Sequence, residues 1–180
     1  AKYPDGCAVS VDGEAVNCAE FRYFMMDKPA GVLSATEDAG QGTVLDLLTR
    51  GQRALGLFPV GRLDKDTTGL LLLTNDGGFA HRVISPKYGV VKTYLALTAS
   101  PMGAEDVAAF SEGLVLADGT RCLPAVLEPL EGCLCRVLVS EGKYHQVKRM
   151  LASRGKPCLS LRRTAIGALE LDAGLGEGGC

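Results

Sequence analysis

The sequence predicts an α+β domain built on a largely antiparallel sheet. Predicted strands outnumber predicted helices along the 180 residues, and short turns join most of the strands. The clearest strand is the run of four leucines at 70–73, which is apolar on both faces, as expected of a strand that is covered on both sides. No internal repeat, heptad pattern or low-complexity stretch indicates another class.

The first half of the chain is expected to form strands around one short helix. Residues 21–26 are rich in aromatic and apolar side chains and lead into 28–31, where proline and glycine favour a turn. Thr43 fits the N-cap of a helix over 44–48, because the apolar residues there share one face. After the leucine strand, residues 75–78 supply a turn and a helix cap.

The second half is expected to alternate between short strands and amphipathic helices. Its helices begin after the cap at 75–78, at Ser100–Pro101 and at Tyr144. Its expected strands are 90–97, 114–116, 123–127, 133–139, 158–161 and 166–171.

Charge is unevenly distributed along the chain, whose formal net charge is −2. Between 142 and 169 the sequence has seven basic residues and no acidic one, so this segment is +7 and the remainder is −9. The seven are Lys143, Lys148, Arg149, Arg154, Lys156, Arg162 and Arg163. A basic face on an acidic protein attracts a polyanion such as RNA. The alternative is a solvated helix face followed by an exposed strand.

Composition argues against several other classes of protein. The seven cysteines are odd in number and include no CxxC pair, so reduced and mostly buried thiols are expected. The two histidines, His81 and His145, lack the spacing of a metal site, and no metal is expected. No apolar run is long enough to cross a bilayer, and the N-terminus has no signal-peptide pattern, so a cytoplasmic location is expected.

Asp64 lies in the polar loop 61–69, directly before the leucine strand. A carboxylate presented from the edge of a rigid strand is well placed for catalysis. The alternative is an aspartate that caps a turn, which is the role expected of Asp66 and Asp76.

Four segments follow one another at 23–31, 61–77, 92–94 and 141–150. The second contains GRLD and TTGLLLLTNDG, and the fourth reads EGKYHQVKRM. In this order they resemble the signature segments of the RsuA branch of the pseudouridine synthases, over roughly residues 21–172. The resemblance implies a mixed sheet in two lobes with a central active-site cleft. It also implies isomerisation of a uridine in RNA, which needs no cofactor.

The resemblance also assigns the catalytic roles. Asp64 would be the nucleophile, since a carboxylate can attack and later leave. A carboxylate in a largely dry pocket needs a nearby cation to stay ionised, and the resemblance supplies Lys148. Tyr94 would stack on the flipped uracil. The alternatives are a phosphate contact or a solvated charge for Lys148 and a core position for Tyr94.

Further residues of the same segments are expected to contact RNA. Arg62 would help to extrude the base, unless it forms an ion pair with a neighbouring acid. The complete set is Arg62, Thr67, Lys92, Lys143, His145, Gln146 and Arg149.

The expected organisation places the catalytic domain at 21–172 and a flexible tail at 173–180. Residues 1–20 are expected to connect to an S4-type RNA-binding domain that such enzymes usually carry and that has no counterpart here. The sequence is therefore expected to be a fragment of a longer protein.

The expected partner is ribosomal RNA, acted on by a monomer, and the segment 144–150 favours the small-subunit RNA over the large-subunit RNA. The rival hypotheses are a non-catalytic module for RNA binding or ribosome assembly and a carboxylate-based nucleoside hydrolase.

Overall fold

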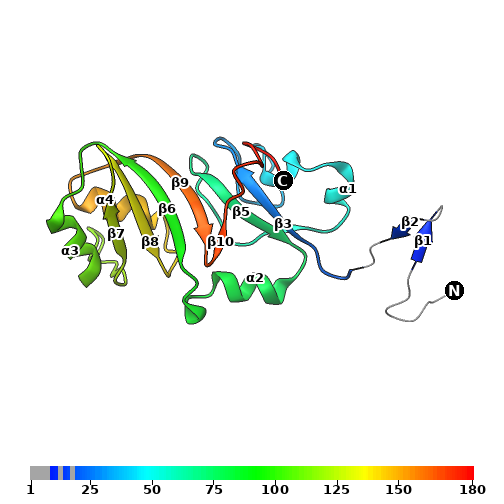
Figure 1. Ribbon diagram of the computed structural model, residues 1–180, viewed down its shortest axis with the longest axis horizontal. Coiled ribbons are helices and arrows are strands. Elements are labelled where there is room, and N and C mark those ends of the chain that lie inside the picture. The colour runs from blue at the N-terminus through cyan, green and yellow to red at the C-terminus, as the bar shows by residue number, and fades with distance from the viewer. Residues whose placement is uncertain (1–8, 12–13, 17–18) are drawn as a thin grey trace.

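The computed structural model describes residues 9–11, 14–16 and 19–180 (Figure 1). The strands of its main sheet are β3 (Tyr23–Lys28), β4 (Phe58–Pro59), β5 (Thr68–Thr74), β6 (Lys92–Thr98), β7 (Val126–Pro129), β8 (Leu134–Val139), β9 (Cys158–Ile166) and β10 (Leu169–Glu170). They are arranged in the order β3-β5-β9-β6-β8-β7, with β4 beside β5 and β10 beside β9. All pairs are antiparallel except β5–β9, which confirms the predicted α+β class with a largely antiparallel mixed sheet.

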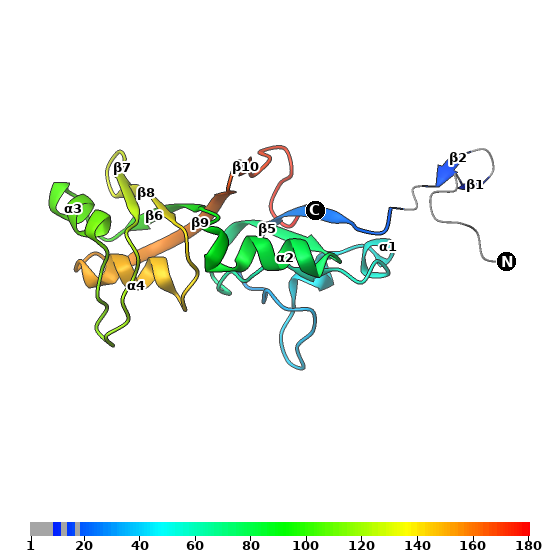
Figure 2. The same cartoon turned by 90° about the horizontal axis from the view of Figure 1, so that it is seen from below.

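The helices divide between the two halves of the sheet. They are the 3₁₀ helices η1 (Val44–Leu47) and η2 (Pro86–Tyr88) and the α-helices α1 (Arg50–Arg53), α2 (Gly77–Ile84), α3 (Ala104–Glu112) and α4 (Gln146–Ser153). Figures 1 and 2 show α1 and α2 with the β3–β5 half, and α3 and α4 with the β6–β8 half. Outside the main sheet, β1 (Val9–Val11) pairs antiparallel with β2 (Glu14–Val16). Within the described ranges, no helix has the length and apolar character to cross a membrane.

Strand β5 is covered on both faces, as its leucine run predicted. Leu70 and Leu72 pack with Val83 of α2, whereas Leu71 and Leu73 pack on the opposite side with Met26. A third core fills the other half of the sheet between its strands and helices α3 and α4. Asp76 caps α2 by accepting a hydrogen bond from the Phe79 N–H at 2.9 Å, which confirms the predicted cap.

The two halves meet where β5 and β9 run parallel, with Thr68 beside Arg162 and Gly69 beside Arg163. Gly69 has a φ of +98°, and a Cβ there would lie 2.2 Å from the Arg163 backbone oxygen. Only glycine fits this approach, because any side chain would force the strands apart. The loop 61–67 before β5 is thereby held close to the second half.

Two element boundaries differ from the sequence prediction. Helix α3 begins at Ala104 rather than near Ser100, because the Asp106 carboxylate accepts the Gly103 N–H at 2.8 Å and fixes the first turn there. The expected strand at 158–161 continues to Ile166 as β9, whereas most of the expected strand at 166–171 is a turn followed by the separate strand β10. The polar residues Arg162 and Arg163 of β9 pair with Leu95 and Tyr94 of β6, so polarity did not end the strand at 161.

Residues 173–180, which were expected to form a flexible tail, end in contact with strand β3. The Gly178 N–H donates to the Asp27 oxygen at 2.8 Å, and the Asp27 N–H donates to the Gly179 oxygen at 3.0 Å. Cys180 packs against the core below β3. The segment therefore pairs with the outer edge of β3 at Asp27, and backbone pairing of this kind needs no side chain that a sequence could reveal.

Asp106 joins α3 to the end of α4. Its buried carboxylate pairs with Arg154 at 3.0 Å and with Lys156 at 2.5 Å. Burial alone would raise the pKa of Asp106, but the hydrogen bonds from Gly103, Lys156 and Arg154 outweigh burial and lower the pKa to about 2.

Gly69→Ala tests the junction between the halves. The substitution is expected to destabilise the fold by more than about 3 kcal/mol, because both the positive φ and the backbone contact oppose a Cβ. Gly31 has a φ of +91° but no atom within 4 Å of its added Cβ, so Gly31→Ala is expected to cost only about 1–2 kcal/mol. Urea unfolding measures both. Equal losses would contradict the close approach at Gly69.

Asp106→Asn tests the buried cluster through its pH dependence. The folded-state pKa of about 2 lies below the ordinary 3.8, so the stabilisation is fully present above 3.8 and is lost as pH falls toward 2. At pH 7 the variant is expected to lose about 2 kcal/mol, and at pH 3 about half of that difference. Urea unfolding at both pH values is the measurement, and a pH-independent difference would argue against the ion pairs.

Candidate active site

The loop that carries Asp64 is fixed by two side chains from the segment 28–34. Ser34 Oγ accepts the Leu63 N–H and donates to the Leu63 oxygen, both at 3.0 Å. Lys28 Nζ donates to the backbone oxygens of Pro29, Lys65 and Thr67 at 2.9, 3.3 and 3.0 Å. These bonds hold the backbone on both sides of Asp64.

Lys28 is completely buried, which is unusual for a lysine. Burial lowers the pKa of Lys28 to about 8, against the opposing effect of the Asp66 and Asp64 charges. Sequence reasoning missed Lys28 and Ser34 as supports of the site. The only signal in the sequence was the family resemblance of residues 23–31, which include Lys28 but not Ser34. No role was assigned to any residue of that segment.

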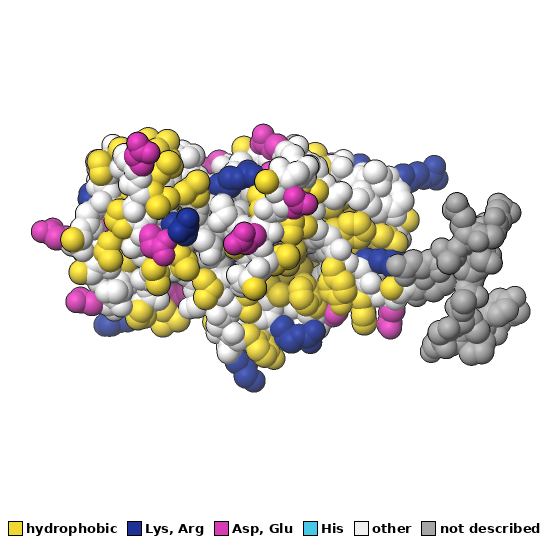
Figure 3. Space-filling view, in the orientation of Figure 1, with side chains coloured by type: hydrophobic (Ala, Val, Ile, Leu, Met, Phe, Trp, Pro, Cys, Tyr) yellow, Lys and Arg dark blue, Asp and Glu magenta, His cyan; other side chains and the backbone are white. Residues whose placement is uncertain are grey.

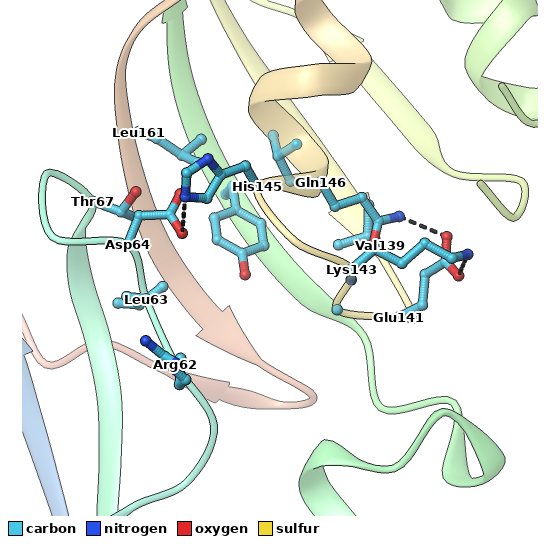
Figure 4. A pocket seen from close by; sticks show the side chains of 13 residues that line it. Arg62, Leu63, Asp64, Thr67, Val139, Glu141, Lys143, His145, Gln146 and Leu161 are labelled. Carbon is cyan, nitrogen blue, oxygen red and sulfur yellow. Dashed lines mark hydrogen bonds and ion pairs between the residues drawn. The ribbon is translucent and has the colours of Figure 1, made fainter. Parts of the chain in front are cut away.

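The Asp64 carboxylate faces α4 across the junction (Figure 4). Lys148 Nζ lies 3.2 Å from one of its oxygens, and His145 Nε2 lies 3.4 Å from the other. Lys148 also contacts Asp66 at 2.5 Å. Burial lowers the pKa of Lys148, but the hydrogen bonds to Asp66 and Asp64 prevail and raise it, so the ammonium is strongly favoured.

His145 reaches Asp64 through an unusual backbone conformation. It precedes α4 with a φ of +47°, the one positive φ of a non-glycine residue in the described chain. Its ring stacks on Tyr144, with centroids 3.8 Å apart and planes at 19°. A strained residue of this kind is often found at functional sites.

Tyr94 lies between the two halves, in contact with the core of each. Its hydroxyl is 3.5 Å from an Arg163 nitrogen, and the Arg163 guanidinium carbon is 6.0 Å from the ring centroid. The alternative of a simple core position does not describe Tyr94, because it is half-buried and lines the cleft beside Asp64.

A cleft of about 840 Å³ opens between the halves. It is large enough for a nucleotide, since ligand sites commonly range from about 300 to 1,000 Å³. Of the residues predicted from sequence, the cleft is lined by Arg62, Asp64, Lys92, Tyr94, Lys143 and His145. Thr67 and Gln146 line a narrower recess beside Asp64.

Gln146, predicted to contact RNA, has its side-chain amide bonded within the protein in this arrangement. It is buried, and its Nε2 donates to Glu141 Oε1 at 2.7 Å while its Oε1 accepts the Lys143 N–H at 2.9 Å. Figure 4 shows its amide turned away from Asp64 toward Glu141. Gln146 therefore positions the loop before α4.

The predicted basic face is largely neutralised by acids from elsewhere in the chain, which corrects the count of charges from sequence. Six of the seven basic residues between 142 and 169 form ion pairs: Lys143 with Glu141, Lys148 with Asp64 and Asp66, Arg149 with Asp118, Arg154 and Lys156 with Asp106, and Arg162 with Asp27. Figure 3 shows basic and acidic side chains interspersed on one face of the molecule. Only Arg163 has no carboxylate partner in the described chain.

Arg62 and Thr67, both predicted to contact RNA, differ from each other in exposure to solvent. Arg62 is exposed at the cleft and forms no ion pair with a described residue, so the ion-pair alternative finds no support. Thr67 is buried, and its hydroxyl has no hydrogen-bond partner among the described residues. No group of three or more metal-ligating side chains occurs in the ranges the structure covers.

The chain is similar to several known proteins in sequence and in fold. A family model for RNA pseudouridylate synthase matches residues 22–153. The chain is 45% identical over 179 residues to the uncharacterised RNA pseudouridine synthase YtzG of Bacillus subtilis, covering 97% of this chain and 75% of that protein. It is 40% identical over 197 residues to the ribosomal small subunit pseudouridine synthase A of Escherichia coli, covering 96% and 84%. A crystal structure of a pseudouridylate synthase matches with a TM-score of 0.82 and 38% identity, covering 99% and 77%.

Ser34→Ala tests the support of the Asp64 loop. It leaves the N–H and the oxygen of buried Leu63 without their partner and is expected to cost about 1–3 kcal/mol in urea unfolding. Ser111 is exposed and its hydroxyl donates only to the Ala108 oxygen. The control Ser111→Ala is therefore expected to stay within about 0.5 kcal/mol. Similar losses in the two variants would argue against the role of Ser34.

Proposed function

The chain belongs to the RNA pseudouridylate synthase family, and from this we propose that it isomerises one uridine of small-subunit ribosomal RNA with Asp64 as the nucleophile. The observation that supports the proposal is the position of Asp64. Its carboxylate lies at the cleft, 3.2 Å from the Lys148 ammonium, on a loop held by Ser34 and Lys28. A fixed and ion-paired carboxylate is suited to nucleophilic attack.

The reaction breaks the bond from uracil N1 to ribose C1′ and forms a bond from uracil C5 to C1′. The proton on C5 is released, and N1 gains a proton, so no electrons are exchanged with another molecule. Asp64 can serve by adding to C1′ or to C6 of the base and leaving again. Lys148 supplies a positive charge beside the Asp64 carboxylate, and Tyr94 provides a ring on which the flipped uracil stacks.

Two residues at the cleft complete the proposal. Arg62 is exposed and uncommitted next to Asp64, which suits a side chain that fills the gap left by the extruded base. His145 contacts the second carboxylate oxygen at 3.4 Å and helps to hold the Asp64 rotamer.

The choice of small-subunit RNA is supported by a relative and by one segment. The relative from Escherichia coli, 40% identical, is named for the ribosomal small subunit. Residues 144–150 place His145 against Asp64, so the segment that favoured this RNA lies at the site itself.

Tritium release from uridine C5 tests the reaction and its substrate. Small- and large-subunit ribosomal RNA labelled at C5 are supplied separately, and release is expected from the small-subunit RNA alone. Asp64→Asn is expected to abolish release, and Lys148→Met to slow it by ~10²-fold, because the carboxylate loses its charge partner.

The matched control is Asp66→Asn. Asp66 also contacts Lys148, but its side chain is 77% exposed, so its loss is expected to change the rate by less than about fivefold. Release from neither RNA, in naked or partly assembled form, would favour a binding module. Release from the large-subunit RNA alone would overturn the choice of substrate.

A further inference from the structure

Two cations of the cleft have donor atoms without an acceptor in the described chain. Lys92 Nζ and Arg163 Nη2 make no hydrogen bond there, although Lys92 is only 8% exposed and Arg163 only 4%. A buried charge that is neither paired nor fully hydrogen-bonded is costly, and such groups are rare in native structures. A ligand that brings acceptor oxygens would explain both.

The sheet places these two residues together. Tyr94 lies directly beside Arg163 in the β6–β9 register, and Lys92 points to the same face of β6 as Tyr94 because the two are two residues apart. All three line the cleft that also contains Asp64. Arg163 is held there by the bond from its Nε to the Leu70 oxygen at 2.7 Å.

The two cations are close enough to act on each other. Burial lowers the pKa of Lys92, and the positive charge of Arg163 lowers it further. The six other basic residues of the 142–169 segment have carboxylate partners, whereas Lys92 and Arg163, which line the cleft, have none in the described chain. A bound anion would therefore supply a negative charge that the described chain does not place beside these two cations.

We propose that Lys92 and Arg163 together bind one phosphodiester group of the RNA, adjacent to the uridine that enters the cleft. A phosphodiester carries a full negative charge and exposes oxygens to both cations, whereas the carbonyl oxygens of uracil are neutral. The volume of about 840 Å³ accommodates a nucleotide together with a flanking phosphate. This inference rests on the proposed function, since it takes RNA as the ligand.

Lys92→Met in the Asp64→Asn chain tests the site without requiring turnover. Binding to small-subunit ribosomal RNA is measured by filter binding over a range of salt concentrations. The affinity is expected to fall about tenfold, and the slope of log affinity against log salt to decrease by about 1, as for the loss of one phosphate contact. The control Lys87→Met removes an exposed charge outside the cleft lining and is expected to leave the affinity within about twofold.

Thermal unfolding of the RNA-free protein separates this role from a structural one. Methionine replaces the buried, unpaired ammonium by an apolar group of similar length, so the melting temperature of Lys92→Met is expected to stay the same or rise. A variant that binds RNA as well as its parent overturns the proposal. So does one that melts at a lower temperature.

Arg163→Met is the second variant. It is expected to weaken RNA binding as well, and the double variant is expected to lose less affinity than the product of the single losses, because both cations hold one group. Independent, multiplicative losses would overturn the shared phosphate. Unchanged affinity with slower tritium release in the Asp64-containing chain would assign the cations to charge on the uracil instead. Failure of the Asp64→Asn chain itself to bind ribosomal RNA would instead overturn the proposed function.

Discussion

The parallel contact between β5 and β9 is the constraint on which the site depends. Gly69 allows β5 to approach the Arg163 backbone so closely that a Cβ would lie 2.2 Å from its oxygen. Five residues earlier, Asp64 is held by Ser34 and Lys28 through Leu63, Lys65 and Thr67. The carboxylate thus belongs to one half of the sheet and its cation to the other. Their separation of 3.2 Å is set by the junction and not by either half alone.

The basic segment 142–169 also depends on contacts with other parts of the chain. A segment with seven basic residues and no acid looks like an RNA-binding face, but five of the seven are matched by carboxylates from distant parts of the chain and Lys143 is matched by nearby Glu141. These pairs secure α4 to its surroundings, which fixes the position of Lys148. Attraction for a polyanion is then concentrated inside the cleft, where Lys92 and Arg163 remain unmatched. Charge that is buried and directed binds one phosphate in a defined place, whereas an exposed patch binds many phosphates in many registers.

Local features of the structure were predictable from sequence, and long-range ones were not. The leucine strand, the Asp76 cap and the class of fold follow from periodicity and cap chemistry, and the meeting of Asp64 with Lys148 followed from resemblance to a family. The clamp formed by Lys28 and Ser34 was missed because it binds backbone atoms, which carry no residue signature. The partners of the basic segment were missed because Asp27, Asp106 and Asp118 lie far away in the chain. The docking of 178–179 on β3 was missed for the same reason as the clamp.

The two unmatched cations also bear on how stability and binding are balanced in this fold. A pocket that must hold an anion only when RNA is present cannot also contain a carboxylate to satisfy its cations, because that carboxylate would compete with the phosphate. The free protein therefore carries an uncompensated charge next to Tyr94. Asp64 solves the opposite problem, since it needs its cation before substrate arrives and has Lys148 within 3.2 Å. One cleft thus keeps a paired charge for the reaction and unpaired charges for the ligand, and Tyr94, on which the base is proposed to stack, lines the same cleft.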